Sequence, residues 1–211
     1  MSSQNRYTYN LRNQVSIIHF VDALFDKHAK LLPVRVDLGY KTNERITIDN
    51  QNSYNDNKFN YLLNPDLPPH AYLSQEVILH NWNELLNRLR WNKREFLKEL
   101  VGYVWKIEYG NDKGIHYHLV LFFNGNKVQK DYYYAEKLGA LWLELTKGLG
   151  VYFNCSSDKT RRYGDNNALK VIHRIDDKAN LYQMMNYLTK VDDNEDIARA
   201  LSGGRLLGKS Y

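Results

Sequence analysis

The chain has 211 residues and a mass of 25.0 kDa, enough for one domain of ordinary size with a hydrophobic core. Hydrophobic residues make up 43% and charged residues 25%, which excludes wholesale disorder, and a formal net charge of +5 permits a polyanionic partner without requiring one. No apolar run approaches the roughly 20 residues that span a bilayer, residues 1–13 lack the apolar segment of a secretory signal, and Cys155 is the single cysteine; we therefore expect a cytoplasmic protein without a membrane partner.

The first third of the sequence predicts a helix, a strand and a long loop. The broad apolar pattern over residues 10–30 indicates a helix that Pro33 ends. Apolar and polar side chains alternate over residues 34–40, as in a half-buried strand. Asn and Pro crowd residues 41–73, which we expect to form a long surface loop.

The rest of the sequence alternates helical and strand patterns. Ser74 is a suitable cap for a helix with an apolar stripe from Ile78 to Leu89. The elements expected after it are, in chain order, strands over 103–109 and 115–123 joined by a tight polar turn, a helix over 129–147, strands over 151–155 and 168–175, and a helix over 177–190. The residues after Val191 are polar and then Gly-rich, which predicts a flexible tail.

This order of elements predicts an α+β fold. A hairpin flanked by long helices indicates an antiparallel β-sheet with helices packed mainly on one face, as in ferredoxin-like and RRM-like domains. We expect an N-terminal helical arm over residues 1–30, one domain over 31–190 that contains the Asn-rich and Pro-rich loop, and a flexible C-terminal tail over 191–211.

Two histidines lie two residues apart on the second strand of the expected hairpin. His116 and His118 therefore point to the same face, where two imidazoles can bind one metal ion. Glu108, on the preceding strand, shares this face if it pairs with His116, which requires a three-residue loop over 111–113. A slip of one residue would turn Glu108 away. The pattern predicts a divalent metal site made of Glu108, His116 and His118.

Other interpretations of these residues stay open. Asp37 and His173 are alternative third ligands for the same ion. The simpler alternative is a pair of surface histidines beside an exposed strand carboxylate.

Tyr187 and Lys190 form a Tyr-x-x-Lys pattern on the last expected helix. They are i, i+3 neighbours, and Tyr187 lies at the margin of the apolar stripe. A tyrosine hydroxyl near an ammonium group is a candidate nucleophile, because the cation favours the phenolate. Tyr182 lies five residues earlier, roughly 140° around the helix, so the two hydroxyls cannot face one phosphate. We expect Tyr187 to be the nucleophile; the alternative is a tyrosine at the rim of the core.

Glu108, the run His116-Tyr117-His118 and the pattern Tyr187-x-x-Lys190 together resemble the HUH endonuclease superfamily, which comprises rolling-circle replication initiators, relaxases and some small transposases. The segments at 35–38 and 103–110, with the Tyr-x-x-Lys pattern, are most similar to the replication proteins of inovirus-type phages and their prophage relatives. The resemblance covers about residues 31–190 and implies an HUH-type DNA nicking and joining endonuclease.

The resemblance also implies a mechanism. His116, His118 and Glu108 would hold Mg²⁺ or Mn²⁺, and the mixed nitrogen and oxygen set fits Mn²⁺ better. Tyr187 would attack single-stranded DNA or an origin hairpin and leave a 5′-phosphotyrosine and a free 3′-hydroxyl that primes rolling-circle replication, while Lys190 positions the phosphate. A host helicase and polymerase would act with the protein in the cytoplasm of a bacterial cell. Because one tyrosine is available, a second subunit or another acceptor would complete the cycle.

Two further motifs are less specific. Lys159, Arg161 and Arg162 form a basic loop that could bind the DNA backbone or simply be solvated. Residues 203–210 match the Walker A pattern, but that pattern binds phosphate only between a strand and a helix, and only Tyr211 follows it in this sequence. We therefore attribute this match to chance.

Three rival functions remain open. One is a small transposase or plasmid initiator with the same site. Another is an RRM-like protein that binds single-stranded nucleic acid without cutting it. The third is a degenerate prophage protein with a regulatory role. A protein that only binds does not need the complete set of Glu108, His116, His118 and Tyr187.

Overall fold

The computed structural model describes residues 8–41, 73–91, 94–158 and 169–210. The elements are, in chain order, α1 (Leu11–Lys27), β1 (Lys30–Tyr40), α3 (Gln75–Trp91), η2 (Glu95–Leu97), β2 (Leu100–Gly110), β3 (Gly114–Asn124), α4 (Asp131–Leu145), β4 (Gly150–Asn154), η3 (Cys155–Asp158), β5 (Ile172–His173), α5 (Ala179–Tyr187), α6 (Glu195–Ser202) and β6 (Leu207–Lys209). The strands form one sheet in the order β4-β1-β3-β2-β6, with β5 paired to β1. Every described pairing is antiparallel, which confirms the expected α+β fold.

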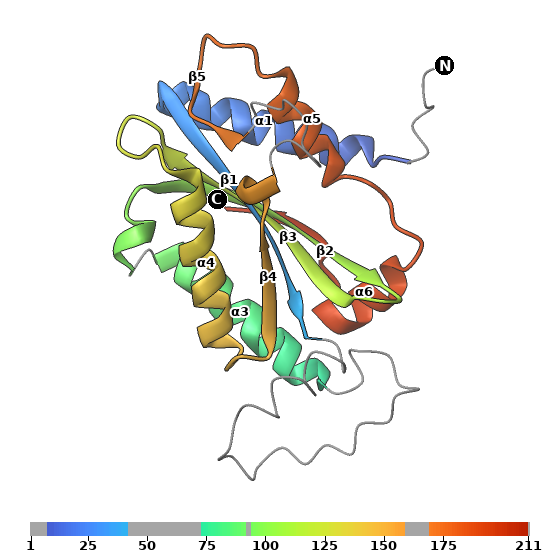
Figure 1. The fold of residues 1–211 in the computed structure, drawn as a ribbon. Coiled ribbons are helices and arrows are strands. Elements are labelled where there is room, and N and C mark those ends of the chain that lie inside the picture. Colours follow the sequence, from blue (N-terminus) through green and yellow to red (C-terminus); the bar gives the residue numbers. More distant parts are fainter. Residues whose placement is uncertain (1–7, 42–72, 92–93, 159–168, 211) are drawn as a thin grey trace.

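Both faces of this sheet are covered by helices. On one face, alternate strand residues such as Val34 and Leu119 pack with α3 and α4. On the other face, Val104 and Val120 pack with α1 and α5, which lie next to each other in Figure 1. The expectation that the helices lie mainly on one face is therefore corrected. The physical reason is that the apolar stripe of α1 packs on a second hydrophobic surface of the sheet and buries it.

The face under α1 and α5 is apolar over only part of its length. Strand residues next to these helices are hydrophobic, but further along the same strands the same-face positions are polar. These polar positions are Arg35, Asp37, Lys106, Glu108, His116 and His118. On this face the sheet thus carries a cluster of ionisable side chains next to the hydrophobic core formed with α1 and α5.

The C-terminal segment is part of the fold, which corrects the expected flexible tail over 191–211. α6 contacts β2 and α3, and β6 pairs with β2 so that Leu207 lies opposite Lys106. The Lys209 Nζ donates to both the backbone oxygen and the hydroxyl of Ser16 on α1, each at 2.8 Å. The Walker-like residues 203–210 therefore run from the end of a helix into an edge strand, the reverse of the strand-to-helix order that a phosphate-binding loop needs.

Some expectations fall on parts of the chain that the structure does not describe. They include most of the Asn-rich loop and the basic residues Lys159, Arg161 and Arg162. Within the described ranges, no helix is both long enough and apolar enough to cross a membrane.

The position of β6 generates a stability prediction at Gly208. A Cβ added there would lie 2.3 Å from the buried ring of Trp105, so Gly208→Ala must displace that ring or the strand. We expect the free energy of unfolding in denaturant to fall by about 1–3 kcal/mol, while Ser202→Ala at the end of α6 serves as the control. An unchanged unfolding midpoint in Gly208→Ala would contradict the pairing of β6 with β2.

Candidate functional site

The pairing of β2 with β3 brings the three predicted metal ligands together. Glu108 lies directly opposite His116, and the strands are joined by the three-residue loop that this register requires. Gly114, the first residue of β3, has a φ of 64°, a conformation that glycine adopts without steric cost. His118 follows two residues after His116 and therefore lies on the same face. The predicted register is confirmed.

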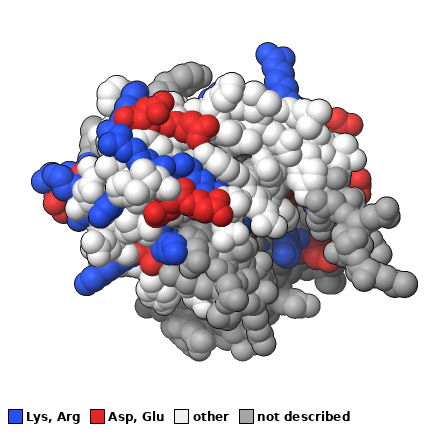
Figure 2. Space-filling model, turned by 90° about the horizontal axis from the view of Figure 1, so that it is seen from above, with Lys and Arg blue, Asp and Glu red and all other residues white. Residues whose placement is uncertain are grey.

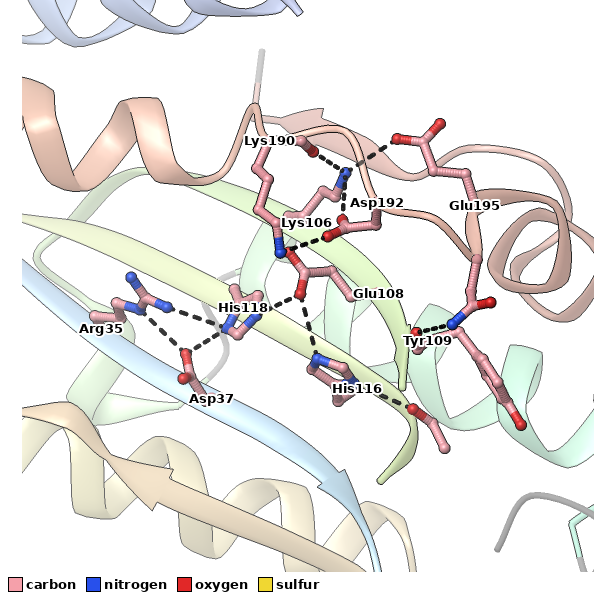
Figure 3. A network of polar contacts seen from close by, with 12 residues as sticks. Arg35, Asp37, Lys106, Glu108, Tyr109, His116, His118, Lys190, Asp192 and Glu195 are labelled. Carbon is pink, nitrogen blue, oxygen red and sulfur yellow. Dashed lines mark hydrogen bonds and ion pairs between the residues drawn. The ribbon is translucent and has the colours of Figure 1, made fainter. Parts of the chain in front are cut away.

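The three side chains converge tightly enough to hold one ion. The Glu108 Oε2 lies 3.4 Å from the His116 Nε2 and 3.2 Å from the His118 Nε2, and all three ligand atoms lie within 4.8 Å of one another (Figure 3). Glu108 is only 7% exposed, and its Oε1 has no hydrogen-bond partner among the described residues. A buried carboxylate oxygen without a partner is costly, and a bound metal ion would satisfy it. Glu108, His116 and His118 therefore fit a metal ion.

Backbone and carboxylate acceptors orient both imidazoles. The His116 Nδ1 lies 3.1 Å from the Gly114 oxygen, and the His118 Nδ1 lies 2.7 Å from the Asp37 Oδ1. If each Nδ1 carries a proton and donates it, each Nε2 is left facing Glu108, which is how metal-binding histidines are usually held. Arg35 completes this arrangement, because its Nε donates to the same Asp37 oxygen at 3.1 Å.

The geometry selects Glu108 over the two alternative third ligands. Asp37 accepts from the Nδ1 of His118, on the side of the ring away from Glu108, and so orients the ligand. His173 pairs with Lys30 at the other end of β1. Lys30 is seven residues from Asp37, a separation of about 23 Å along an extended strand. His173 therefore lies far from the cluster.

The ionisable groups of the site stabilise one another's charges. Burial alone would raise the pKa of Asp37 and of Glu108, but the neighbouring histidines, with Arg35 beside Asp37, hold both pKa values well below their usual range. Burial alone would lower the pKa of His118, whereas Asp37 and Glu108 raise it to about 9. Asp37 and Glu108 thus favour the protonated form of His118, and a metal ion bound at the Nε2 would displace the proton there.

Tyr187 lies at the end of α5, directly beside this cluster. Its ring meets the His118 ring edge-on, with 6.0 Å between the ring centroids, and the Arg35 guanidinium carbon lies 5.2 Å from the centroid of the tyrosine ring. Burial and then the Glu108 charge raise the pKa of Tyr187, and the cations Lys190 and Arg35 offset this only in part. The expected phenolate character is therefore outweighed, because burial and Glu108 favour the neutral phenol of Tyr187.

Lys190 and Tyr182 occupy different surroundings. The Lys190 Nζ lies 2.9 Å from the Asp192 Oδ1; burial alone would lower the pKa of this lysine, but Asp192 raises it. The Tyr182 hydroxyl donates to the Asp22 carboxylate on α1. As the helical spacing predicted, the two tyrosines of α5 face different groups, and Tyr187 is the one beside the metal-binding cluster.

Glycines leave His116 uncovered from two neighbouring strands. A Cβ added at Gly39 on β1 would lie 3.7 Å from the His116 Cβ, and one added at Gly110 on β2 would lie 3.7 Å from its Cε1. The side chain of His116 is 19% exposed, about twice as much as those of His118 and Glu108. The site is therefore most accessible at His116.

The surface over α1 and α5 has no single sign of charge. Figure 2 shows Lys and Arg side chains next to Asp and Glu side chains on this face, with an uncharged area beside them. Among the described residues, the cations close to the cluster are instead Arg35, Lys106 and Lys190, each in contact with a carboxylate.

Comparison with known proteins gives one match. Residues 3–144 match the family described as YagK/YfjJ C-terminal domain. No curated protein and no solved structure matches the chain. The matched stretch contains Glu108, His116 and His118 and ends before α5, so it includes the metal-binding cluster and stops short of Tyr187.

Metal binding is tested by thermal unfolding with and without Mn²⁺. A ligand that binds only the folded state adds about 2.7 kcal/mol at a hundred times its dissociation constant, so Mn²⁺ should raise the melting temperature. We expect His116→Ala to lose this increase and His173→Ala, outside the cluster, to keep it. An equal increase in His116→Ala and the unsubstituted protein would contradict the site.

Asp37 is expected to act on the metal only through His118. Asp37→Asn keeps the shape of the side chain but weakens the acceptor, so its affinity for Mn²⁺ should fall by roughly 10- to 100-fold without disappearing. Calorimetric titration can compare it with Glu108→Gln, which removes a ligand. If binding is lost as completely in Asp37→Asn as in Glu108→Gln, Asp37 is itself a ligand.

Proposed function

We propose that this chain, which belongs to the YagK/YfjJ C-terminal domain family, is a metal-dependent endonuclease of the HUH type that nicks and rejoins single-stranded DNA. The observation that carries the proposal is the position of Tyr187. A tyrosine that ends a helix contacts a buried cluster of two histidines and one carboxylate, with a lysine three residues further on. Phosphodiester transfer of this type requires a nucleophile, a metal-binding set and a cation close together, so this arrangement supports the proposal.

The metal-binding set favours Mn²⁺ over Mg²⁺. Two of its three donor atoms are imidazole nitrogens, which Mn²⁺ accepts more readily than Mg²⁺ does. When bound, such an ion supplies positive charge that polarises a phosphate and stabilises the charge that develops on it. His116, His118 and Glu108 would hold it, and the accessible side of the site at His116 leaves room for a substrate oxygen.

Tyr187 performs the bond-making step. Its Oη attacks the scissile phosphorus and forms a tyrosine–phosphate ester, while the bond from phosphorus to the 3′-oxygen breaks. The proton of the phenol is balanced by the proton that the leaving 3′-oxygen gains, so the products are a 5′-phosphotyrosine and a free 3′-hydroxyl. Attack of a 3′-hydroxyl on this ester reverses the step and rejoins a strand.

Cations beside Tyr187 suit this role. The raised pKa of Tyr187 reflects burial and the Glu108 carboxylate, whereas Lys190 and Arg35 act in the opposite direction. Positive charge added at Glu108 by a metal ion would lower the barrier to ionising the phenol further. Lys190 is the cation expected to position the phosphate, and its charge interacts with those of both Glu108 and Tyr187.

The substrate and the biological role rest on the resemblance of residues 31–190 to HUH enzymes. That resemblance supports single-stranded DNA or an origin hairpin as substrate and initiation of rolling-circle replication as role, with a host helicase and polymerase as partners in a bacterial cytoplasm. A single active tyrosine supports a cycle that a second subunit or another acceptor completes.

Covalent capture of DNA tests the proposal. The protein is incubated with a degenerate pool of labelled single-stranded DNA and Mn²⁺ and then analysed on a denaturing gel. We expect a labelled protein band that Tyr187→Phe abolishes, because only the attacking oxygen is removed, while binding of Mn²⁺ persists. Tyr182→Phe on the same helix is the matched control and should retain the adduct.

Each other outcome has a definite meaning. An adduct that survives Tyr187→Phe would assign the nucleophile to another residue. Binding of single-stranded DNA without any adduct, in the presence of Mn²⁺, would favour a protein that binds nucleic acid without cutting it.

A further inference from the structure

Lys106 is a buried lysine that the proposed reaction does not use. It lies on β2 two residues before Glu108 and directly opposite His118, and only 4% of it is exposed. Its Nζ donates to the backbone oxygen of Lys190 at 2.9 Å and lies 3.3 Å from the Asp192 Oδ2 and 3.5 Å from the Glu195 Oε1. A charge this deeply buried is retained only with such partners.

These contacts join β2, the strand that carries Glu108, to the residues that follow Tyr187 (Figure 3). Asp192 lies between two ammonium groups, since its other oxygen is 2.9 Å from the Lys190 Nζ. Lys106 therefore contacts Lys190 in two ways. It donates directly to the Lys190 carbonyl, and it contacts Asp192, which pairs with the Lys190 side chain.

The chain between Tyr187 and Lys190 is short and internally bonded. The backbone N–H of Lys190 donates to the backbone oxygen of Tyr187 at 3.2 Å. The backbone N–H groups of the two preceding residues each donate in the same way to the residue three positions earlier. These three consecutive bonds tie the backbone of Lys190 directly to that of Tyr187. On its other side the segment forms an isolated β-bridge with Tyr9, just before α1, through backbone bonds between Asn10 and Thr189 and between Val191 and Thr8.

We infer that Lys106 is a positioning residue for the nucleophile. It fixes the position of the turn after Tyr187 relative to Glu108, His116 and His118. Through Asp192 it also orients the Lys190 ammonium toward these three residues. This inference rests on the proposed function, because it assigns Lys106 a part in the attack by Tyr187.

The test compares the buried Lys106 with Lys209, a partly buried lysine of the same sheet. Lys106→Met removes the ammonium but keeps an unbranched side chain, and Lys106→Arg keeps a cation. Lys209→Met is the matched control, because Lys209 also anchors a neighbouring element, the helix α1, but does not contact the turn after Tyr187. Single-turnover adduct formation is measured at saturating Mn²⁺ and single-stranded DNA, together with DNA affinity and the rise in melting temperature caused by Mn²⁺.

We expect adduct formation to slow by about 100-fold in Lys106→Met, as misplacement of a reacting group by about 1 Å can do. DNA affinity and the effect of Mn²⁺ on melting should stay at the levels of Lys209→Met, and Lys106→Arg should recover part of the rate. If Lys106→Met reacts as fast as Lys209→Met, the inference is overturned.

A second measurement separates this inference from the proposed function. In protein labelled with 3-fluorotyrosine, the signal of Tyr187 is the one missing from Tyr187→Phe, and bound Mn²⁺ should broaden it. We expect less broadening in Lys106→Met than in Lys209→Met. If the unsubstituted protein forms no adduct, the proposed function fails; a difference in broadening between the two variants would then still show that Lys106 holds Tyr187 in place beside Glu108, His116 and His118. Equal broadening in both variants contradicts the positioning of Tyr187 by Lys106.

Discussion

The pairing register of β2 and β3 is the constraint on which the candidate site depends. Opposite residues of an antiparallel pair share a face, so the pairing of Glu108 with His116 determines that carboxylate and imidazoles meet. A shift of one residue would send Glu108 into the hydrophobic core, where Ile107 and Tyr117 now lie. The three-residue loop and Gly114 hold this register, and both cores of the sheet reinforce it.

The second constraint is that α1 and α5 cover only part of one sheet face. The helix α5 therefore ends where the hydrophobic strand positions give way to ionisable ones, and its last residue, Tyr187, contacts His118. Because Lys106 extends from the same face to the chain after α5, the segment that follows Tyr187 is tied to the strand that carries Glu108. The proximity of Tyr187 to Glu108, His116 and His118, on which the proposed function depends, thus follows from how one helix ends on one sheet.

Local pattern was enough to predict much of this arrangement. The spacing of His116 and His118, the short loop before them and the angle between Tyr182 and Tyr187 are properties of single strands, turns and helices. The helix α1 ends at Lys27 and not at Pro33, which lies within β1. On the outer edge of β1, β5 pairs before Pro33 and β4 pairs after it, so no described strand on that edge needs the missing N–H of Pro33.

Features that depend on distant contacts could not be read from the sequence. The helix α6 has eight residues and β6 three, too few to form without the surfaces of α3 and β2 against which they pack. The network of Lys106 joins residues more than 80 positions apart, and in the sequence this lysine is only one polar residue of an alternating strand. The positions of α1 and α5 likewise depend on tertiary packing, because the apolar stripe of a helix does not determine which face of the sheet it covers.

The most direct test of this account is the diffraction of crystals grown with Mn²⁺, measured where manganese scatters anomalously. The account predicts one anomalous peak within coordination distance of the Nε2 atoms of His116 and His118 and a carboxylate oxygen of Glu108, with Asp37 still bonded to the His118 Nδ1. An ordered site in which these four side chains keep their direct contacts and no peak lies among them would contradict it.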